Sequence, residues 1–169
     1  MLAKFKNIFI FIFLCLLSVH SYSSPDLPSI IYAKVKKIVD GDTVHLYHMD
    51  FGVLKVRLAD IDAPETKQPY GEIAKNFLKT KIEDKIVTLK KTASDKYGRI
   101  VGIIYYKNIE INEDLVINGM AWSYDYYNSR KNIKEAEDYA KQNKIGLWSE
   151  DIEAIPPWEW RKTKKEAQK

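Results

Sequence analysis

The chain has 169 residues and a formal net charge of +4, with 30% charged and 46% apolar residues, which is typical of one ordinary globular domain with short extensions. Lys4 and Lys6 precede the first acidic residue, Asp26, so the remaining chain has 25 basic and 23 acidic residues. A net charge of +2 after Asp26 excludes a strongly basic protein, so any contact with a polyanion must use a local patch.

The N-terminal segment has the layout of a secretory signal peptide. A short region with two lysines precedes an apolar run at 8–19, and small serines follow at 21 and 23. The run is short for a membrane span, which needs about twenty residues. We therefore predict that residues 1–23 are removed and that the protein is secreted or periplasmic, with no stable membrane association. The only cysteine, Cys15, lies in this run, so the remaining chain has no thiol.

Apolar patterns in the first half predict three strands and one helix. Ile31, Ala33 and Val35 alternate with polar residues and face one side of a strand. The turn motif DGD (40–42) joins this strand to the next. The predicted strands span 31–39, 43–47 and 53–58, and the predicted helix spans 71–82. The apolar face of this helix consists of Ile73, Ala74, Phe77 and Leu78.

The second half predicts two strands and two helices. The strands span 86–90 and 100–106, and the second is nearly all apolar, which favours a central position. Asn112 is predicted to cap a short helix that stops at Gly119. A last helix at 133–144 has an apolar face of Ile133, Ala136, Tyr139 and Ala140. Pro156 and Pro157 are predicted to end regular structure and leave a frayed tail.

Five short strands interrupted by one helix after the third strand favour a small closed barrel. We predict a mainly β fold with α-helices: a five-stranded barrel of the OB type with about three flanking helices. The domain is expected at 28–151, followed by a C-terminal tail at 152–169.

Two groups of carboxylates follow predicted strands. Asp40 and Asp42 lie in VDGDTV, and Asp60, Asp62 and Glu65 lie in RLADIDAPETK. Crowded carboxylates repel one another, and a hard divalent cation with oxygen ligands would remove the repulsion. Few histidines and no remaining cysteine argue against zinc. Taken alone, each group also fits a tight turn or a solvated polar loop, but antiparallel pairing can bring the two groups together.

Cations and aromatic residues form two further sets. Arg57 and Arg99 lie at strand edges, where a guanidinium can grip a phosphate or form an ordinary surface salt bridge. Tyr97, Tyr124 and Tyr127 can stack exposed bases or pack in the core, and the core is favoured for Trp122. Packing on the barrel is also favoured for Trp158 and Trp160 in the tail.

Five motifs together resemble the staphylococcal nuclease-like, or thermonuclease, family. In the order and spacing of that family they are VDGDTVHL (39–46), VRLADIDAPETK (56–67), SDKYGRIVGIIY (94–105), NGMAWSY (118–124) and AKQNKIGLWSE (140–150). The ending PPWEWR (156–161) resembles that of bacterial secreted members. The resemblance implies an OB barrel with flanking helices and calcium-dependent hydrolysis of DNA and RNA to 3′-phosphate products.

The resemblance also implies roles for single residues. Asp42 and Asp62 match the calcium-binding carboxylates, and Ala63 would supply a backbone carbonyl to the ion, where the best-known member has threonine. Asp40 resembles a second acid near the ion. Glu65 resembles the general base for the attacking water.

Arg57 and Arg99 match the two phosphate-gripping arginines of the family. Residues that match nucleotide contacts are Lys96, Tyr97, Tyr124 and Tyr127, the last two by a spacing that departs from the best-known member. Asp60 replaces an apolar residue of that member and has no assigned role beyond support near the ion or a solvated charge.

The expected partners are DNA and RNA, single-stranded or frayed, bound by a monomer. The alternative is a non-catalytic OB-fold module that binds nucleic acid, which would not need Asp42, Asp62 and Glu65 together. A calcium-binding structural domain is a third possibility, and it would not need Arg57 and Arg99.

Overall fold

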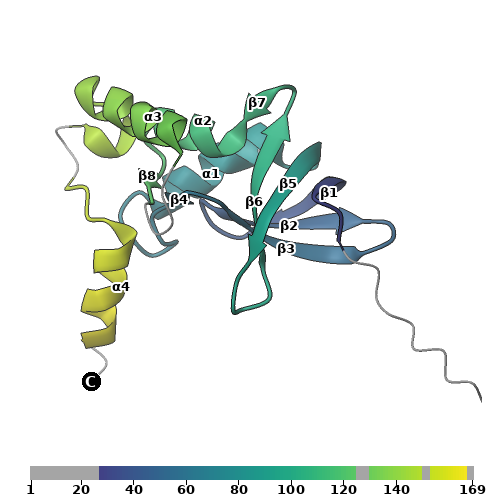
Figure 1. Cartoon of the computed structure of the whole chain (residues 1–169). Coiled ribbons are helices and arrows are strands. Elements are labelled where there is room, and N and C mark those ends of the chain that lie inside the picture. Colours follow the sequence, from purple (N-terminus) through teal and green to yellow (C-terminus); the bar gives the residue numbers. More distant parts are fainter. Residues whose placement is uncertain (1–26, 125–129, 150–152, 167–169) are drawn as a thin grey trace, which may run out of the picture.

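The computed structural model describes residues 27–124, 130–149 and 153–166. Within these ranges the long strands are β1 (Ile30–Ile38), β2 (Thr43–His48), β3 (Gly52–Leu58), β5 (Ile86–Ser94) and β6 (Ile100–Tyr106). They close into a barrel in the order β3-β2-β1-β5-β6 (Figure 1). Neighbours in this order are antiparallel, and a parallel pairing of β3 with β6 completes the closure. The predicted five-stranded OB-type barrel is confirmed.

Short strands extend this framework at two places. β4 (Ile61–Asp62) pairs with β8 (Trp122–Ser123), so that Asp62 lies opposite Trp122. β7 (Ile109–Glu110) pairs with the end of β6. Sequence patterns did not predict these strands, because two residues are too few to show an alternation.

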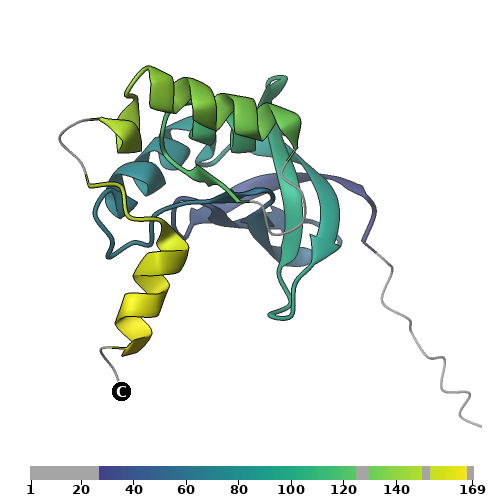
Figure 2. The ribbon, with the colours of Figure 1, turned by 60° about the vertical axis from the view of Figure 1, so that its left-hand side comes forward.

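The helices gather on one side of the barrel (Figure 1, Figure 2). They are α1 (Gly71–Ile82), α2 (Ile111–Ile117), α3 (Lys131–Gln142), the 3-10 turn η1 (Gly146–Trp148) and α4 (Pro157–Glu166). α2 and α3 pack together beside the barrel, whereas α4 projects away from it. Among the described residues, no helix has the length and apolar character needed to cross a bilayer.

The barrel interior is filled by the side chains that the β1 alternation predicts. Ile31, Ala33 and Val35 are buried, and burial of a large aliphatic side chain contributes roughly 1.5–3 kcal/mol. Two predicted core positions are wrong: Ile73 of α1 and Tyr139 of α3 are each 51% exposed. The buried stripe of each helix runs through neighbouring smaller or aliphatic residues instead, at 74, 78 and 82 in α1 and at 133, 136 and 140 in α3.

Asn112 has a different role from the predicted helix cap. The cap position of α2 is Glu110, and Asn112 lies in the first turn with no exposed surface. Its Nδ2 donates to the carbonyls of Ala59 (2.9 Å) and Gly102 (3.2 Å), and its Oδ1 accepts the N–H of Ile104 at 3.1 Å. The side chain therefore joins α2 to β6 and to the segment after β3, and it adds a buried partner to the Gly102 carbonyl, which also accepts the N–H of Ala59 at 2.8 Å.

The prediction of a frayed tail after Pro156 and Pro157 is wrong, because α4 begins at Pro157. Proline suits a first helical position, where its missing N–H has no intrahelical partner anyway. The helix is anchored by tertiary contacts: Pro157 is buried, and the Trp158 ring lies 5.8 Å from that of Tyr124 and 6.5 Å from that of Trp122. The expectation that Trp158 packs on the barrel domain is thus confirmed.

We predict that Asn112→Ala destabilises the protein by about 2–3 kcal/mol, because two buried carbonyls and one buried N–H lose a partner together. Urea unfolding monitored by circular dichroism measures the change. Asn143→Ala is the matched control, since the exposed Asn143 amide donates to the Tyr139 carbonyl and water can replace it. Equal stability of the Asn112 variant and wild type would contradict the proposed role of this side chain.

Candidate active site

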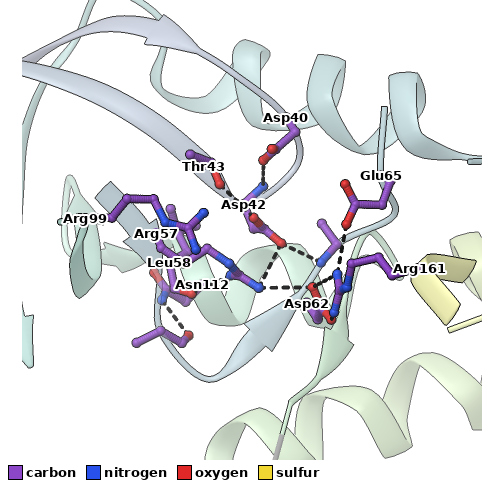
Figure 3. Close-up of polar contacts among 12 residues, drawn as sticks. Asp40, Asp42, Thr43, Arg57, Leu58, Asp62, Glu65, Arg99, Asn112 and Arg161 are labelled. Carbon is purple, nitrogen blue, oxygen red and sulfur yellow. Dashed lines mark hydrogen bonds and ion pairs between the residues drawn. The ribbon is translucent and has the colours of Figure 1, made fainter. Parts of the chain in front are cut away.

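The ends of β2, β3 and β4 bring both predicted carboxylate groups together (Figure 3). β2 and β3 are antiparallel with Thr43 opposite Arg57, so Asp42, which directly precedes β2, lies next to Arg57. A turn at Asp60 then leads into β4 and places Asp62 at the same point. These side chains line a cleft with a volume of about 560 Å³.

The Asp42 carboxylate is almost buried and is fixed by neighbouring donors. Its Oδ2 accepts the N–H of Ala63 at 2.8 Å, and its Oδ1 accepts the hydroxyl of Thr43 at 3.0 Å. The Asp42 carbonyl accepts the N–H of Leu58 at 2.8 Å. Because these donors come from separate segments, the orientation of the carboxylate is set by the fold.

Arg57 lies between the two aspartates. Its Nη2 is 3.2 Å from Asp42 Oδ2 and 3.0 Å from Asp62 Oδ1, and its Nη1 donates to the Leu58 carbonyl at 2.7 Å. Only 16% of the Arg57 side chain is exposed, so this contact differs from the solvated surface salt bridge that was the simpler alternative. The guanidinium offsets the repulsion between two carboxylates that the fold forces together.

Asp62 is shielded almost completely, with 2% of its side chain exposed. Burial raises the pKa of the Asp62 carboxyl above its ordinary value, and the hydrogen bond from Arg161 opposes that rise. A nearby cation therefore favours the ionised form of this buried group.

Arg161 of α4 supplies a second guanidinium that the sequence analysis did not assign to the site. Its Nη2 lies 2.7 Å from Asp62 Oδ2, and its Nη1 lies 2.8 Å from Glu65 Oε1. Residues 62 and 161 are 99 positions apart, and the tail was expected to fray, so the contact was missed. One feature of the sequence could have indicated this contact: Arg161 is one of only four arginines in the chain, and it directly follows the aromatic sequence WEW, which can pack on the barrel domain.

Asp40 supports the loop that carries Asp42. Its Oδ1 accepts the N–H of Asp42 at 3.1 Å, as the tight-turn interpretation of DGD predicts. Burial and the neighbouring Asp42 charge raise the pKa of Asp40 to about 6. Gly41 lets the loop pack closely, because a Cβ there would lie 2.7 Å from the Cβ of Ala63.

The segment around Glu65 is held in a compact turn beside the start of α1. The Glu65 N–H donates to Gln68 Oε1 at 3.1 Å, and the Gln68 N–H donates to the Glu65 carbonyl at 2.8 Å. Gly71 is required at the helix start, because a Cβ there would collide with the Glu65 carbonyl. The Glu65 side chain is 40% exposed and lines the cleft, so it is accessible to a bound molecule.

The turn between β5 and β6 places Arg99 and Tyr97 on another wall of the cleft. Asp95 fixes Arg99 through its Oδ2, 2.7 Å from Nε. Tyr97 is 72% exposed, with the Lys96 ammonium 5.2 Å and the Arg99 guanidinium 5.7 Å from its ring centre. Lys96 is not among the residues that line the cleft, although it lies next to Tyr97.

Of the two predicted platform tyrosines, Tyr124 lines the cleft and Tyr127 lies outside the described residues. Tyr124 is half-buried, and its ring lies against Trp158 of α4. Trp122 is 4% exposed, which confirms the prediction that it belongs to the core.

Asp60, which had no firm role, pairs with Arg130 at the start of α3. The distance from Asp60 Oδ2 to Arg130 Nε is 2.7 Å, and Arg130 also forms a two-pronged contact with Glu110 at 2.8 and 2.6 Å. The Asp60 carbonyl accepts the N–H of Tyr124 at 2.9 Å. Asp60 thus holds the turn before β4 against the helical side of the molecule.

The atoms at the centre of the cleft that could bind a metal ion are the carboxylate oxygens of Asp42 and Asp62. In the part of the chain that the structure describes, no group of three or more acidic, histidine or cysteine side chains is arranged to hold a metal. Two carboxylates still fit a hard divalent cation that completes its coordination with a backbone carbonyl and water. They do not fit zinc, which prefers nitrogen and sulfur ligands.

Comparisons with known proteins agree with this geometry. Residues 55–150 match the family model described as "Staphylococcal nuclease homologue". A protein of Escherichia coli named "Uncharacterized endonuclease" is 38% identical over 85% of this chain and 93% of its own length. "Micrococcal nuclease" of Shigella flexneri is 36% identical over 79% of this chain and 82% of its own length. "Staphylococcal-like nuclease CAN1" of Arabidopsis thaliana is 38% identical, over 66% of this chain and 34% of its own length.

The matched region covers more than half of the chain and contains most of the residues that line the cleft, Arg57, Asp62, Glu65 and Arg99 among them. The alignment with the Escherichia coli protein extends over most of both chains. The chain therefore belongs to the staphylococcal nuclease family and is a nuclease.

Proposed function

We propose that this nuclease hydrolyses DNA and RNA in a calcium-dependent reaction and leaves products with 3′-phosphate ends. The observation that supports this most is the pair Asp42 and Asp62, which Arg57 contacts at 3.2 and 3.0 Å in a cleft that also contains Glu65. Such a cleft combines oxygen ligands for a hard cation, a carboxylate for proton transfer and positive charge for a phosphodiester.

Single-stranded or frayed nucleic acid is the substrate form that the cleft walls favour. Exposed aromatic rings beside cations bind unpaired bases by stacking and hold the backbone by charge. Tyr97, with Lys96 and Arg99 close to its ring, has this arrangement, and Tyr124 lines the same cleft. We assign these residues, together with Tyr127, to substrate binding.

The proposed mechanism uses separate residues for the ion, the water and the phosphate. Asp42, Asp62 and the Ala63 carbonyl would hold calcium, which supplies Lewis-acid polarisation and a bound water. Glu65 removes a proton from the attacking water, directly or through a second water. The water oxygen bonds to phosphorus and the bond from phosphorus to the 5′ oxygen breaks. The departing 5′ oxygen takes up a proton from solvent and leaves as a hydroxyl group, and the phosphate stays on the 3′ side.

Positive charge is needed where the phosphoryl oxygens become more negative. Arg57 lines the cleft from β3 and Arg99 from the turn before β6, so they can neutralise that charge on different sides of the phosphate. Asp40 holds the Asp42 backbone and so keeps its carboxylate in place.

We also propose that residues 1–23 act as a signal peptide and that the monomeric nuclease works in the periplasm or outside the cell. The support is the charged, apolar and small-residue pattern of this segment, which lies outside the described residues.

We predict that Glu65→Gln, Arg57→Ala and Arg99→Ala each lower the rate of DNA cleavage by at least about 10²–10³-fold, the usual cost of removing one preorganised charge or donor. Fluorescence release from a labelled single-stranded oligonucleotide measures the rate. Glu72→Gln is the matched control for Glu65→Gln, because Glu72 is exposed on α1 and does not line the cleft. Near-wild-type turnover in any of the three variants, with the fold intact, would remove that residue from the mechanism.

We predict that calcium at about a hundred times its dissociation constant raises the melting temperature by about 5–10 °C over protein in a chelator. Differential scanning fluorimetry measures the shift. Asp42→Asn should abolish most of it, and magnesium should give a smaller shift, since it demands tighter octahedral geometry than a site with few carboxylates offers. An equal shift with both ions would contradict the calcium assignment.

The calcium shift should also shrink as the pH falls from 8 to 5. The pKa of Asp40 in the folded protein, about 6, lies above its ordinary value of 3.8. Without the ion, the folded protein therefore loses stability as the pH rises through about 4 to 6 and Asp40 ionises. Calcium favours the ionised carboxylates, whereas protons compete with it at Asp40 and at Asp62, whose pKa burial also raises. A calcium shift of constant size from pH 5 to pH 8 would contradict this coupling.

A further inference from the structure

Arg161 occupies an unusual position for a side chain from a C-terminal helix. Figure 3 shows it between Asp62 and Glu65, which are the proposed metal ligand and the proposed general base. Its Nη1 lies 3.3 Å from Asp62 Oδ1 and 2.8 Å from Glu65 Oε1, and its Nη2 lies 2.7 Å from Asp62 Oδ2. One guanidinium therefore contacts both oxygens of one carboxylate and an oxygen of the other.

The contact is supported by the way in which α4 is docked. Trp158 packs against Trp122 and Tyr124, and the Gln68 Nε2 donates to the Ile155 carbonyl at 2.5 Å just before the helix. The same Gln68 side chain accepts the N–H of Glu65 through its Oε1. The buried Gln68 side chain thus contacts both the segment before α4 and the Glu65 turn. These contacts fix the position of α4 relative to Glu65, and so the distance from the Arg161 backbone to the Glu65 carboxylate.

The arginines use the lone pairs of Asp62 that a metal ion would need. Asp62 Oδ1 has the Arg57 Nη2 at 3.0 Å and the Arg161 Nη1 at 3.3 Å, while Oδ2 has the Arg161 Nη2 at 2.7 Å. These contacts use about three of the four lone pairs of the carboxylate. A cation that binds both oxygens must therefore displace at least one of these groups, and a cation that binds Oδ2 alone lies beside the Arg161 guanidinium, whose like charge opposes it. Arg161 is the more easily displaced, because 45% of its side chain is exposed against 16% for Arg57.

The contact with Glu65 is different, because it does not involve a proposed metal ligand. The Arg161 guanidinium can leave Asp62 and still hold Glu65 Oε1, which keeps the Glu65 carboxylate oriented. The contact of Arg161 with Asp62 can therefore affect calcium binding, while its contact with Glu65 affects turnover.

We propose that Arg161 is a positioning residue that holds Glu65 for proton transfer and competes with calcium for Asp62. This inference rests on the proposed function and adds to it a residue from outside the barrel. It requires that loss of the guanidinium has opposite effects on two quantities: calcium binds more tightly, and turnover falls. A merely structural contact would weaken both, because a loosened cleft holds the ion less well.

Arg161→Gln tests the proposal, since glutamine keeps a long side chain but cannot form the ion pairs. Lys162→Gln is the matched control, because it removes one positive charge from the adjacent, exposed position of α4. Calcium affinity is obtained from melting temperature against calcium concentration in the absence of substrate. The kcat and KM values are measured on a single-stranded oligonucleotide at saturating calcium.

We expect the calcium dissociation constant of Arg161→Gln to be about three- to tenfold lower than that of wild type. This is the change expected if Arg161 occupies Asp62 in about 70–90% of the wild-type molecules, because only the remaining molecules can bind the ion. We expect kcat to fall about 10- to 100-fold, the usual effect of losing a partner that orients a catalytic group, with little change in KM. Arg161→Lys keeps the charge without the planar fork, so both values should move back toward wild type. Lys162→Gln should change neither.

Each outcome decides between the proposals. Calcium affinity in Arg161→Gln that is equal to or weaker than wild type would overturn the competition at Asp62. An unchanged kcat would overturn the positioning of Glu65. No calcium-dependent shift in wild type or in Arg161→Gln would contradict the calcium site itself, and with it this inference, whereas equal shifts in both would contradict this inference alone.

Discussion

Two nearly buried carboxylates, Asp42 and Asp62, share the Arg57 guanidinium, and the other features of the cleft depend on this contact. Carboxylates lose much of their hydration when they are buried, and their mutual repulsion grows as the surroundings become less polar. Positive charge must therefore be present wherever these groups remain ionised. Arg57 and Arg161 supply it in the structure, and a hard divalent cation is the further source that an all-oxygen donor set selects.

The barrel topology fixes the positions of these acidic side chains, so the loss of hydration and the repulsion between them cannot be avoided. Antiparallel pairing of β2 with β3 fixes Asp42 beside Arg57, and the β4–β8 pair fixes Asp62 opposite Trp122. Asp60 and Arg130 hold the intervening turn against α3. Rigid strands thus place the charged groups, while more exposed side chains on the Glu65 turn and at Tyr97 face the solvent side of the cleft.

Much of this arrangement could be predicted from the sequence, and the exceptions share a physical cause. Alternation, or for 100–106 a nearly continuous apolar run, predicted the long strands, and the helical pattern predicted the bounds of α1, because such patterns reflect which faces are buried. The two-residue strand β4, the buried network of Asn112 and the helix α4 depend on contacts between distant segments. Arg161 is the clearest case: only the packing of Trp158 on Trp122 and Tyr124 brings residue 161 to residue 62.

The most direct measurement is the cleavage of single-stranded DNA, RNA and plasmid DNA by purified protein, with calcium or with a chelator, followed by analysis of the product ends. The proposed function predicts that all cleavage depends on calcium and leaves 3′-phosphate ends. Equal cleavage in the chelator, or binding of nucleic acid without cleavage in calcium, would contradict the central role given to Asp42 and Asp62.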